Sequence, residues 1–68
     1  MQRYLWRDDE YGITTIITIA DEGCRVETRH GGYLVCDLPI PLEKALNAVE
    51  KYGYMLIVDT YHRNGVSP

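Results

Sequence analysis

Residue types that commonly act as nucleophiles are scarce in this chain of 68 residues. Its only serine, Ser67, stands next to the last residue, and its only cysteines are Cys24 and Cys36. Both cysteines fall on the core side of the strands expected below, where a thiol in apolar surroundings stays protonated and unreactive. Asp37 and Asp59 are expected on opposite edges of the sheet, too far apart for joint acid–base catalysis. The sequence therefore predicts a protein that is not an enzyme.

The residues with side chains suited to a metal are Cys24, His30, Cys36 and His62. His30 follows Cys24 by six residues, which is about 20 Å along an extended strand at roughly 3.3 Å per residue. Zinc requires its ligands at about 2.0–2.3 Å, so this pair cannot share one ion. The glycine pair at residues 31–32 opens no helix and therefore offers no positive helix end to a phosphate group. We predict neither a metal site nor a cofactor.

One helix is expected between Pro41 and Gly53. Proline suits the first helical position, and glycine suits the left-handed residue that ends a helix. Strands are expected at residues 4–7, 13–20, 24–30, 33–38 and 54–61, because these segments are rich in β-branched residues or alternate between turn signals. Five apolar residues recur at helical spacing and form one stripe along the helix: Leu42, Ala45, Leu46, Val49 and Tyr52.

The predicted fold class is α+β, an antiparallel sheet of about five strands with one helix packed on one face. The element order is β-β-β-β-α-β and the predicted sheet order is 4-3-2-1-5, because the helix returns the chain beside the first strand. The alternative places the last strand parallel to the fourth through a right-handed crossover. Residues 1–64 are expected to form a single domain, and residues 65–68 a flexible tail.

Loop lengths decide which residues share a face of the sheet, because side chains in a strand alternate between faces. A two-residue turn at Gly31 and Gly32 would bring Arg25, Glu27 and Arg29 onto the core side, at a cost of several kcal/mol. We therefore expect a three-residue loop with Gly32 in the left-handed conformation. The core predicted in this way combines the helix stripe with Tyr4, Trp6, Ile13, Ile17, Ile19, Cys24, Val26, Leu34, Cys36, Leu38, Tyr54, Leu56 and Val58.

The face of the sheet opposite the helix combines aliphatic, tyrosine and arginine side chains. A single helix cannot cover both faces, and this mixture is typical of protein interfaces, although scattered surface aliphatic residues are also normal. The aromatic residues are six tyrosines and one tryptophan, types that interfaces favour. The predicted partner-binding residues are Arg3, Leu5, Arg7, Ile16, Arg25, Arg29, Tyr33, Val35, Met55, Ile57 and Tyr61.

The sequence thus predicts a small protein-interaction module, acting as a homodimer or as an adaptor or inhibitor of another protein. The alternative is a module that binds single-stranded nucleic acid, with Arg25 and Arg29 on phosphates and Tyr33 stacked on a base. The net charge of −3 disfavours non-specific binding to nucleic acid. No apolar run approaches the length of a membrane span, and the first residues lack the apolar stretch of a signal peptide. We therefore expect a cytoplasmic protein without a membrane partner.

Overall fold

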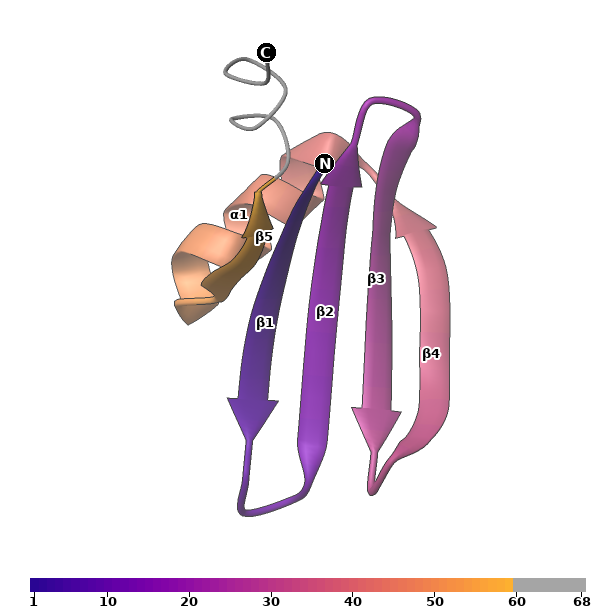
Figure 1. The fold of residues 1–68 in the computed structure, drawn as a ribbon, viewed down its shortest axis with the longest axis vertical. Coiled ribbons are helices and arrows are strands. Elements are labelled where there is room, and N and C mark those ends of the chain that lie inside the picture. The colour runs from indigo at the N-terminus through magenta and orange to yellow at the C-terminus, as the bar shows by residue number, and fades with distance from the viewer. Residues whose placement is uncertain (60–68) are drawn as a thin grey trace, which may run out of the picture.

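The computed structural model describes residues 1–59, which form five strands and one helix in the predicted chain order (Figure 1). The expected end of the last strand at residue 61, the domain boundary at 64 and the tail at 65–68 lie outside the described residues. The elements are β1 (Gln2–Asp8), β2 (Ile13–Ala20), β3 (Gly23–His30), β4 (Tyr33–Ile40), α1 (Leu42–Tyr52) and β5 (Met55–Asp59).

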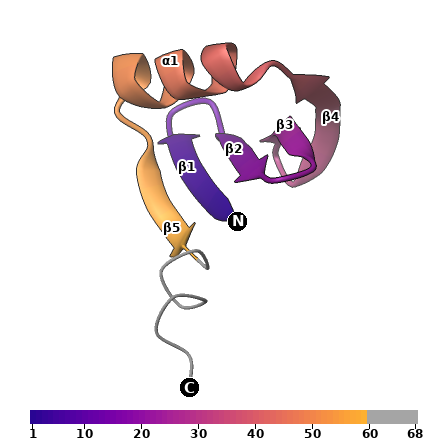
Figure 2. The same ribbon diagram turned by 90° about the horizontal axis from the view of Figure 1, so that it is seen from above.

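All five strands belong to one antiparallel sheet in the order β4-β3-β2-β1-β5. β5 pairs antiparallel with β1, which confirms the predicted order and rules out a parallel pairing with β4. α1 lies against one face of the sheet and contacts β2 and β3 (Figure 2). The predicted α+β class is therefore confirmed, and the helix leaves the other face of the sheet uncovered.

Local sequence determines where α1 begins and ends. Pro41 precedes the helix, one position earlier than predicted, and its carbonyl accepts the first helical hydrogen bond from the N–H of Ala45 at 3.0 Å. Gly53 ends the helix in the left-handed conformation (φ 67°), as predicted. The N–H groups of Gly53 and Tyr54 both donate to the carbonyl of Val49. This cap turns the chain back toward the sheet, so that β5 can pair with β1.

The turn between β3 and β4 differs from the prediction of a three-residue loop. His30 pairs directly with Tyr33, so the loop has only two residues. Both of them have a positive φ, 59° at Gly31 and 87° at Gly32. A type I′ turn requires positive φ at both central residues, and its twist matches that of the flanking strands. The glycine pair therefore favours the shorter loop.

A bulge in β4 supplies the extra residue that we expected in the turn. Leu34 pairs with Arg29 and Cys36 pairs with Thr28, which leaves Val35 without a partner. Cys36 reaches the core side beside Thr28, as predicted. Leu34 was predicted in the core as well, but it lies opposite Arg29 and is 50% exposed. The sheet thus keeps the charges of β3 out of the core through a bulge rather than a longer loop.

A second bulge changes the faces of the residues at the end of β5. Tyr4 pairs with Leu56 and Arg3 pairs with Val58, which leaves Ile57 as the extra residue. Val58 was predicted in the core, yet it lies opposite Arg3 on the face away from α1. The prediction failed because it assumed uninterrupted alternation after the helix cap.

The core is smaller than predicted, and α1 contacts it through smaller side chains. Leu42 and Leu46 of the predicted helix stripe are 53% and 49% exposed. Leu38 and Leu56, also predicted in the core, are exposed to a similar degree. Alanines on the packed side allow a helix to approach the sheet closely, and the leucines beside them are then left at the margin. The buried apolar side chains are Ile17, Ile19, Cys24 and Ala45, surrounded by the partly buried Tyr4, Val26, Ile40, Ala48, Val49 and Tyr54.

Candidate protein-interaction face

The open face is the side of the sheet that α1 does not cover (Figure 2). Its side chains alternate with the buried Ile17 and Ile19 and therefore point away from the helix. Within residues 1–59, α1 is the only helix, and it packs on the opposite face. The side chains that the strand register places on the open face are Arg3, Leu5, Arg7, Thr14, Ile16, Thr18, Ala20, Arg25, Glu27, Arg29, Leu34, Asp37, Pro39, Met55 and Val58.

Three aliphatic residues form a continuous row across the open face. Leu5 on β1 pairs with Ile16 on β2 and with Met55 on β5. Directly paired side chains in an antiparallel sheet have Cβ atoms about 4.5–5.5 Å apart, so the three form one patch. Leu5 and Ile16 are half-buried between their neighbours, whereas Met55 is 64% exposed on the edge strand. The row is therefore an apolar strip whose most accessible end is Met55.

Arginines lie above and below this aliphatic row. Arg3 and Arg7 stand two positions to either side of Leu5, which places them on the same face of β1. Arg25 and Arg29 repeat this spacing on β3. An apolar centre with arginines around it has the composition of a protein interface, in which arginine is enriched.

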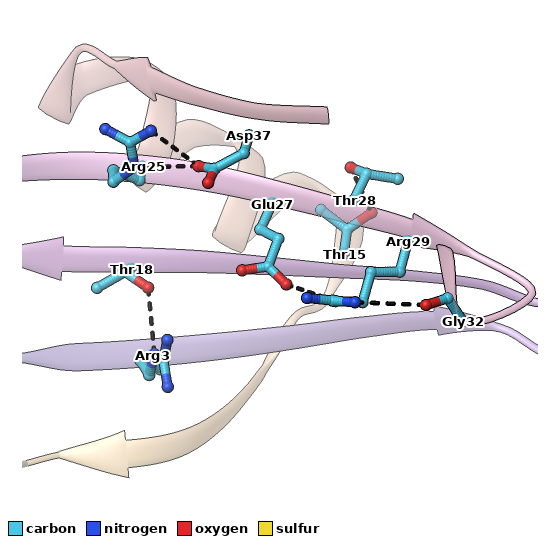
Figure 3. Close-up of polar contacts among 9 residues, drawn as sticks. All are labelled: Arg3, Thr15, Thr18, Arg25, Glu27, Thr28, Arg29, Gly32 and Asp37. Carbon is cyan, nitrogen blue, oxygen red and sulfur yellow. Dashed lines mark hydrogen bonds and ion pairs between the residues drawn. The ribbon is translucent and has the colours of Figure 1, made fainter. Parts of the chain in front are cut away.

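The two arginines of β3 are paired with carboxylates inside the chain (Figure 3). Nε and Nη2 of Arg25 on β3 both donate to Oδ1 of Asp37 on β4, at 3.0 and 2.9 Å. Nε of Arg29 donates to Oε2 of Glu27 at 2.7 Å, and its Nη1 donates to the carbonyl of Gly32 at 3.3 Å. Both ion pairs are substantially exposed, so they orient the side chains more than they stabilise the fold.

The two arginines of β1 are less engaged than those of β3. Nε of Arg3 donates to Oγ1 of Thr18 at 3.3 Å (Figure 3). None of the ion pairs within residues 1–59 includes Arg3. Nη2 of Arg7 lies 3.1 Å from Oδ1 of Asp9, and these side chains are 62% and 83% exposed. An exposed pair of this kind contributes at most about 1 kcal/mol. β1 therefore offers a partner two guanidinium groups beside the aliphatic row.

Strand register shows which predicted binding residues share the open face. Tyr33 does not belong there, because it pairs with His30, which alternates onto the helix side with Thr28. Val35 and Ile57 are the bulge residues, 61% and 44% exposed, and Tyr61 lies outside the described residues. The predicted residues that the structure brings together on the open face are Arg3, Leu5, Arg7, Ile16, Arg25, Arg29 and Met55.

A hollow beside the exposed end of the aliphatic row was not evident from the sequence. Its volume is about 320 Å³, and it lies where β5 begins, because β5 pairs with β1 only as far as Leu5. The hollow exists because of the point at which the chain rejoins the sheet after α1, and no local sequence pattern specifies that point. Partners commonly bury an anchor side chain in a hollow of this kind. The lining residues are Leu5, Trp6, Arg7, Tyr52, Gly53 and Met55.

The side chains suited to a metal ion do not gather at one place within residues 1–59. No cluster of three or more His, Cys, Asp or Glu residues within 1–59 could hold a metal ion, and His62 lies outside this range. Cys24 and Cys36 are free thiols, and Cys24 is buried. Asp37 lies on the edge strand β4, far from the opposite edge β5. No helix among these residues has the length and apolar character needed to cross a membrane.

Comparison of the chain with known protein families, with curated proteins and with solved structures found no match.

Proposed function

We propose that this chain is a small non-enzymatic module that binds another protein through its open face. The observation that carries the proposal is the row of Met55, Leu5 and Ile16, set between arginines on the uncovered side of the sheet. The aliphatic row supplies apolar area, whose burial contributes about 25 cal/mol per Å². Arg3 and Arg7 supply charge-assisted hydrogen bonds to carboxylates of the partner.

The open face has the size of a small specific interface. Five strands at roughly 4.8 Å spacing and about seven residues at roughly 3.3 Å cover about 24 by 23 Å, or about 550 Å². Two partners together would bury about 1,100 Å², just above the roughly 1,000 Å² that a specific interface needs and below the roughly 1,600 Å² of a typical one. We therefore expect a reversible complex rather than a permanent assembly.

The charge of the open face indicates the kind of partner. Its four arginines and two carboxylates sum to 4 − 2 = +2, whereas the whole chain carries −3. Two copies placed face to face would bring surfaces of like charge together, which disfavours association. An aliphatic patch bordered by aspartate or glutamate would complement both the aliphatic row and the positive charge of the open face. The proposed partner is therefore a different protein with such a patch, and we favour an adaptor or inhibitor role over a homodimer.

Single-stranded nucleic acid is the less favoured ligand of the two predicted from the sequence. Arg25 and Arg29 already donate to Asp37 and Glu27, carboxylates that would repel a phosphate group. Tyr33 pairs with His30 on the other side of the sheet, so it cannot stack a base above these arginines. We expect labelled single-stranded RNA to show no saturable binding at moderate salt, because few phosphate contacts are free to form.

Affinity capture with matched variants tests the proposal. The baits are the wild-type chain, Met55→Asp and Arg3→Glu, with Leu42→Asp and Lys44→Glu as controls that make the same chemical changes on exposed positions of α1. Each bait is incubated with an extract of the source cells, and the captured protein is then purified and titrated against every variant by calorimetry. We expect the controls to bind as the wild type does. The open-face variants should raise Kd about thirtyfold, which corresponds to a loss of about 2 kcal/mol of binding free energy.

Two results would contradict this proposal. If Met55→Asp bound the captured protein as tightly as the wild type, the open face would not be the binding surface. If sedimentation of the pure chain showed a dimer that Met55→Asp dissociates, the partner would be a second copy. Circular dichroism checks that each variant is folded, as expected because Met55 is 64% exposed.

A further inference from the structure

A second hollow lies on the helix side of the sheet, at the end of α1. Its volume is about 200 Å³, and its lining residues are Trp6, Thr15, Tyr52 and Tyr54. Trp6 and Thr15 are directly paired on β1 and β2, whereas Tyr52 and Tyr54 stand on either side of the residue that caps the helix. Three of the four lining residues are therefore aromatic, and none carries a charge. We call this hollow the aromatic pocket.

One side of the aromatic pocket is held firmly by the fold. Thr15 is 8% exposed, and its hydroxyl forms a hydrogen bond with that of Thr28 at 3.3 Å. Tyr54 packs against the core. Tyr52, by contrast, is 56% exposed and provides an accessible wall. The pocket is thus formed before any ligand arrives, and Tyr52 is the wall that can be changed without disturbing the core.

The electrostatic surroundings of the aromatic pocket favour a cation. The faces of aromatic rings carry partial negative charge and attract cations. Tyr52 is the last residue of an 11-residue helix, whose C-terminal end is the negative end of the helix dipole. The Tyr52 ring already attracts a cation of this chain, because Nζ of Lys51 lies 5.4 Å from its centroid. An anion would meet unfavourable charge from both the rings and the helix end.

We propose that the aromatic pocket binds a methylated ammonium group, carried either by a small molecule or by a methylated lysine side chain. Methyl groups spread the charge over an apolar surface, so the cation can contact several rings without a carboxylate partner. An ordinary ammonium group is strongly hydrated and gives up water less readily. None of the four residues that line the aromatic pocket belongs to the open face, although Trp6 and Tyr52 also line the hollow beside Met55.

Fluorescence of Trp6, the only tryptophan of the chain, reports directly on the pocket. Choline is titrated in parallel with 3,3-dimethylbutan-1-ol, a neutral molecule of the same shape in which carbon replaces the charged nitrogen. We expect choline to change the emission of Trp6 saturably and to bind about tenfold more tightly than the alcohol, because only choline gains the cation–π attraction.

Variants at the accessible wall separate ligand binding from general effects on the fold. Tyr52→Leu should weaken choline binding by about 2- to 30-fold, and Tyr52→Phe should retain it, since the ring is what attracts the cation. Lys51→Gln should strengthen binding, because it removes a like charge beside Tyr52. Tyr11→Leu serves as the matched control, because Tyr11 is also well exposed (62%) but lies in the turn between β1 and β2.

A second arm of the experiment identifies the source of the methylated group. A short peptide with one trimethylated lysine is compared with the same peptide unmodified and with choline. Tighter binding of the trimethylated peptide than of choline indicates a protein ligand, and the reverse indicates a free small molecule; either supports the inference. The inference is overturned if the folded protein binds the neutral alcohol as tightly as choline, or if neither choline nor the trimethylated peptide alters the emission of Trp6.

Discussion

Replacement of Ile17 by alanine tests whether the observed core holds this fold together. Ile17 is 1% exposed and is the largest fully buried side chain within residues 1–59. Truncation of a buried isoleucine to alanine costs about 2–5 kcal/mol, because apolar contacts are lost and a cavity remains. A chain of 68 residues has a total stability of roughly 3–10 kcal/mol, at about 0.05–0.15 kcal/mol per residue. We therefore expect Ile17→Ala to remove about half of the free energy of unfolding.

Urea denaturation followed by circular dichroism measures this change, with Leu46→Ala as the matched control. Leu46 belongs to the helix stripe predicted from the sequence, but it is 49% exposed. Its truncation removes side-chain atoms that are only half covered, so we expect a cost of about 1 kcal/mol. If Leu46→Ala destabilised the protein as much as Ile17→Ala, α1 would contact the sheet through its leucines, and the core described above would be wrong.

Three further predictions concern the turn, alkaline stability and an ion pair. Gly32→Ala should destabilise the protein by about 1 kcal/mol in thermal denaturation, because a φ of 87° strains a residue with a side chain; an equal Tm for wild type and variant would contradict the turn assignment. Burial raises the pKa of Tyr54 above its ordinary value of 10.0, so the folded state favours the neutral phenol. The resulting stability is fully present below about pH 10 and is lost as the pH rises through the folded pKa. Tyr54→Phe should therefore reduce the fall in Tm across an alkaline series, and an unchanged fall would refute this origin. Asp37→Asn should change urea stability by less than about 1 kcal/mol, since the pair with Arg25 is exposed, and a larger loss would show that the pair stabilises the fold.

The order of the strands could be predicted because the local signals and the alternating strand directions leave few possible sheet orders. The ends of α1 follow from Pro41 and Gly53, residues whose backbone preferences act without help from the rest of the chain. Four meandering strands must alternate in direction, and a single returning helix brings the last strand back across the sheet. Alternation also placed Leu5 and Ile16 on the same face of the sheet, and the structure pairs them directly.

The two bulges could not be predicted because alternation fixes only whether an extra residue is present, not where it lies. An extra residue in the turn or in β4 brings Cys36 to the same side of the sheet. The two arrangements differ only in the face on which Tyr33 and Leu34 lie, because these residues stand between the turn and the bulge. The prediction was wrong at those two positions. The positive φ required of both central residues in a two-residue turn was the available signal at Gly31 and Gly32.

The sequence pattern could not predict which residues of the helix stripe are buried or where the hollow beside Met55 lies, and both failures have the same physical origin. A helical pattern shows which residues are apolar, but the side chain that contacts the sheet depends on how closely two elements pack. Ala45 is fully buried while the larger Leu42 is half exposed, a difference that periodicity alone does not contain. The hollow beside Met55 likewise depends on the tertiary position at which β5 begins.

Mapping of amide chemical shifts shows whether a partner protein binds to the open face. The isotope-labelled chain is titrated with the captured partner, and each backbone amide within residues 1–59 is followed. We expect the largest changes at Leu5, Ile16 and Met55, with smaller ones at Arg3 and Arg7 and none on the exposed side of α1. Changes confined to α1 or to the outer edge of β4 would contradict this expectation.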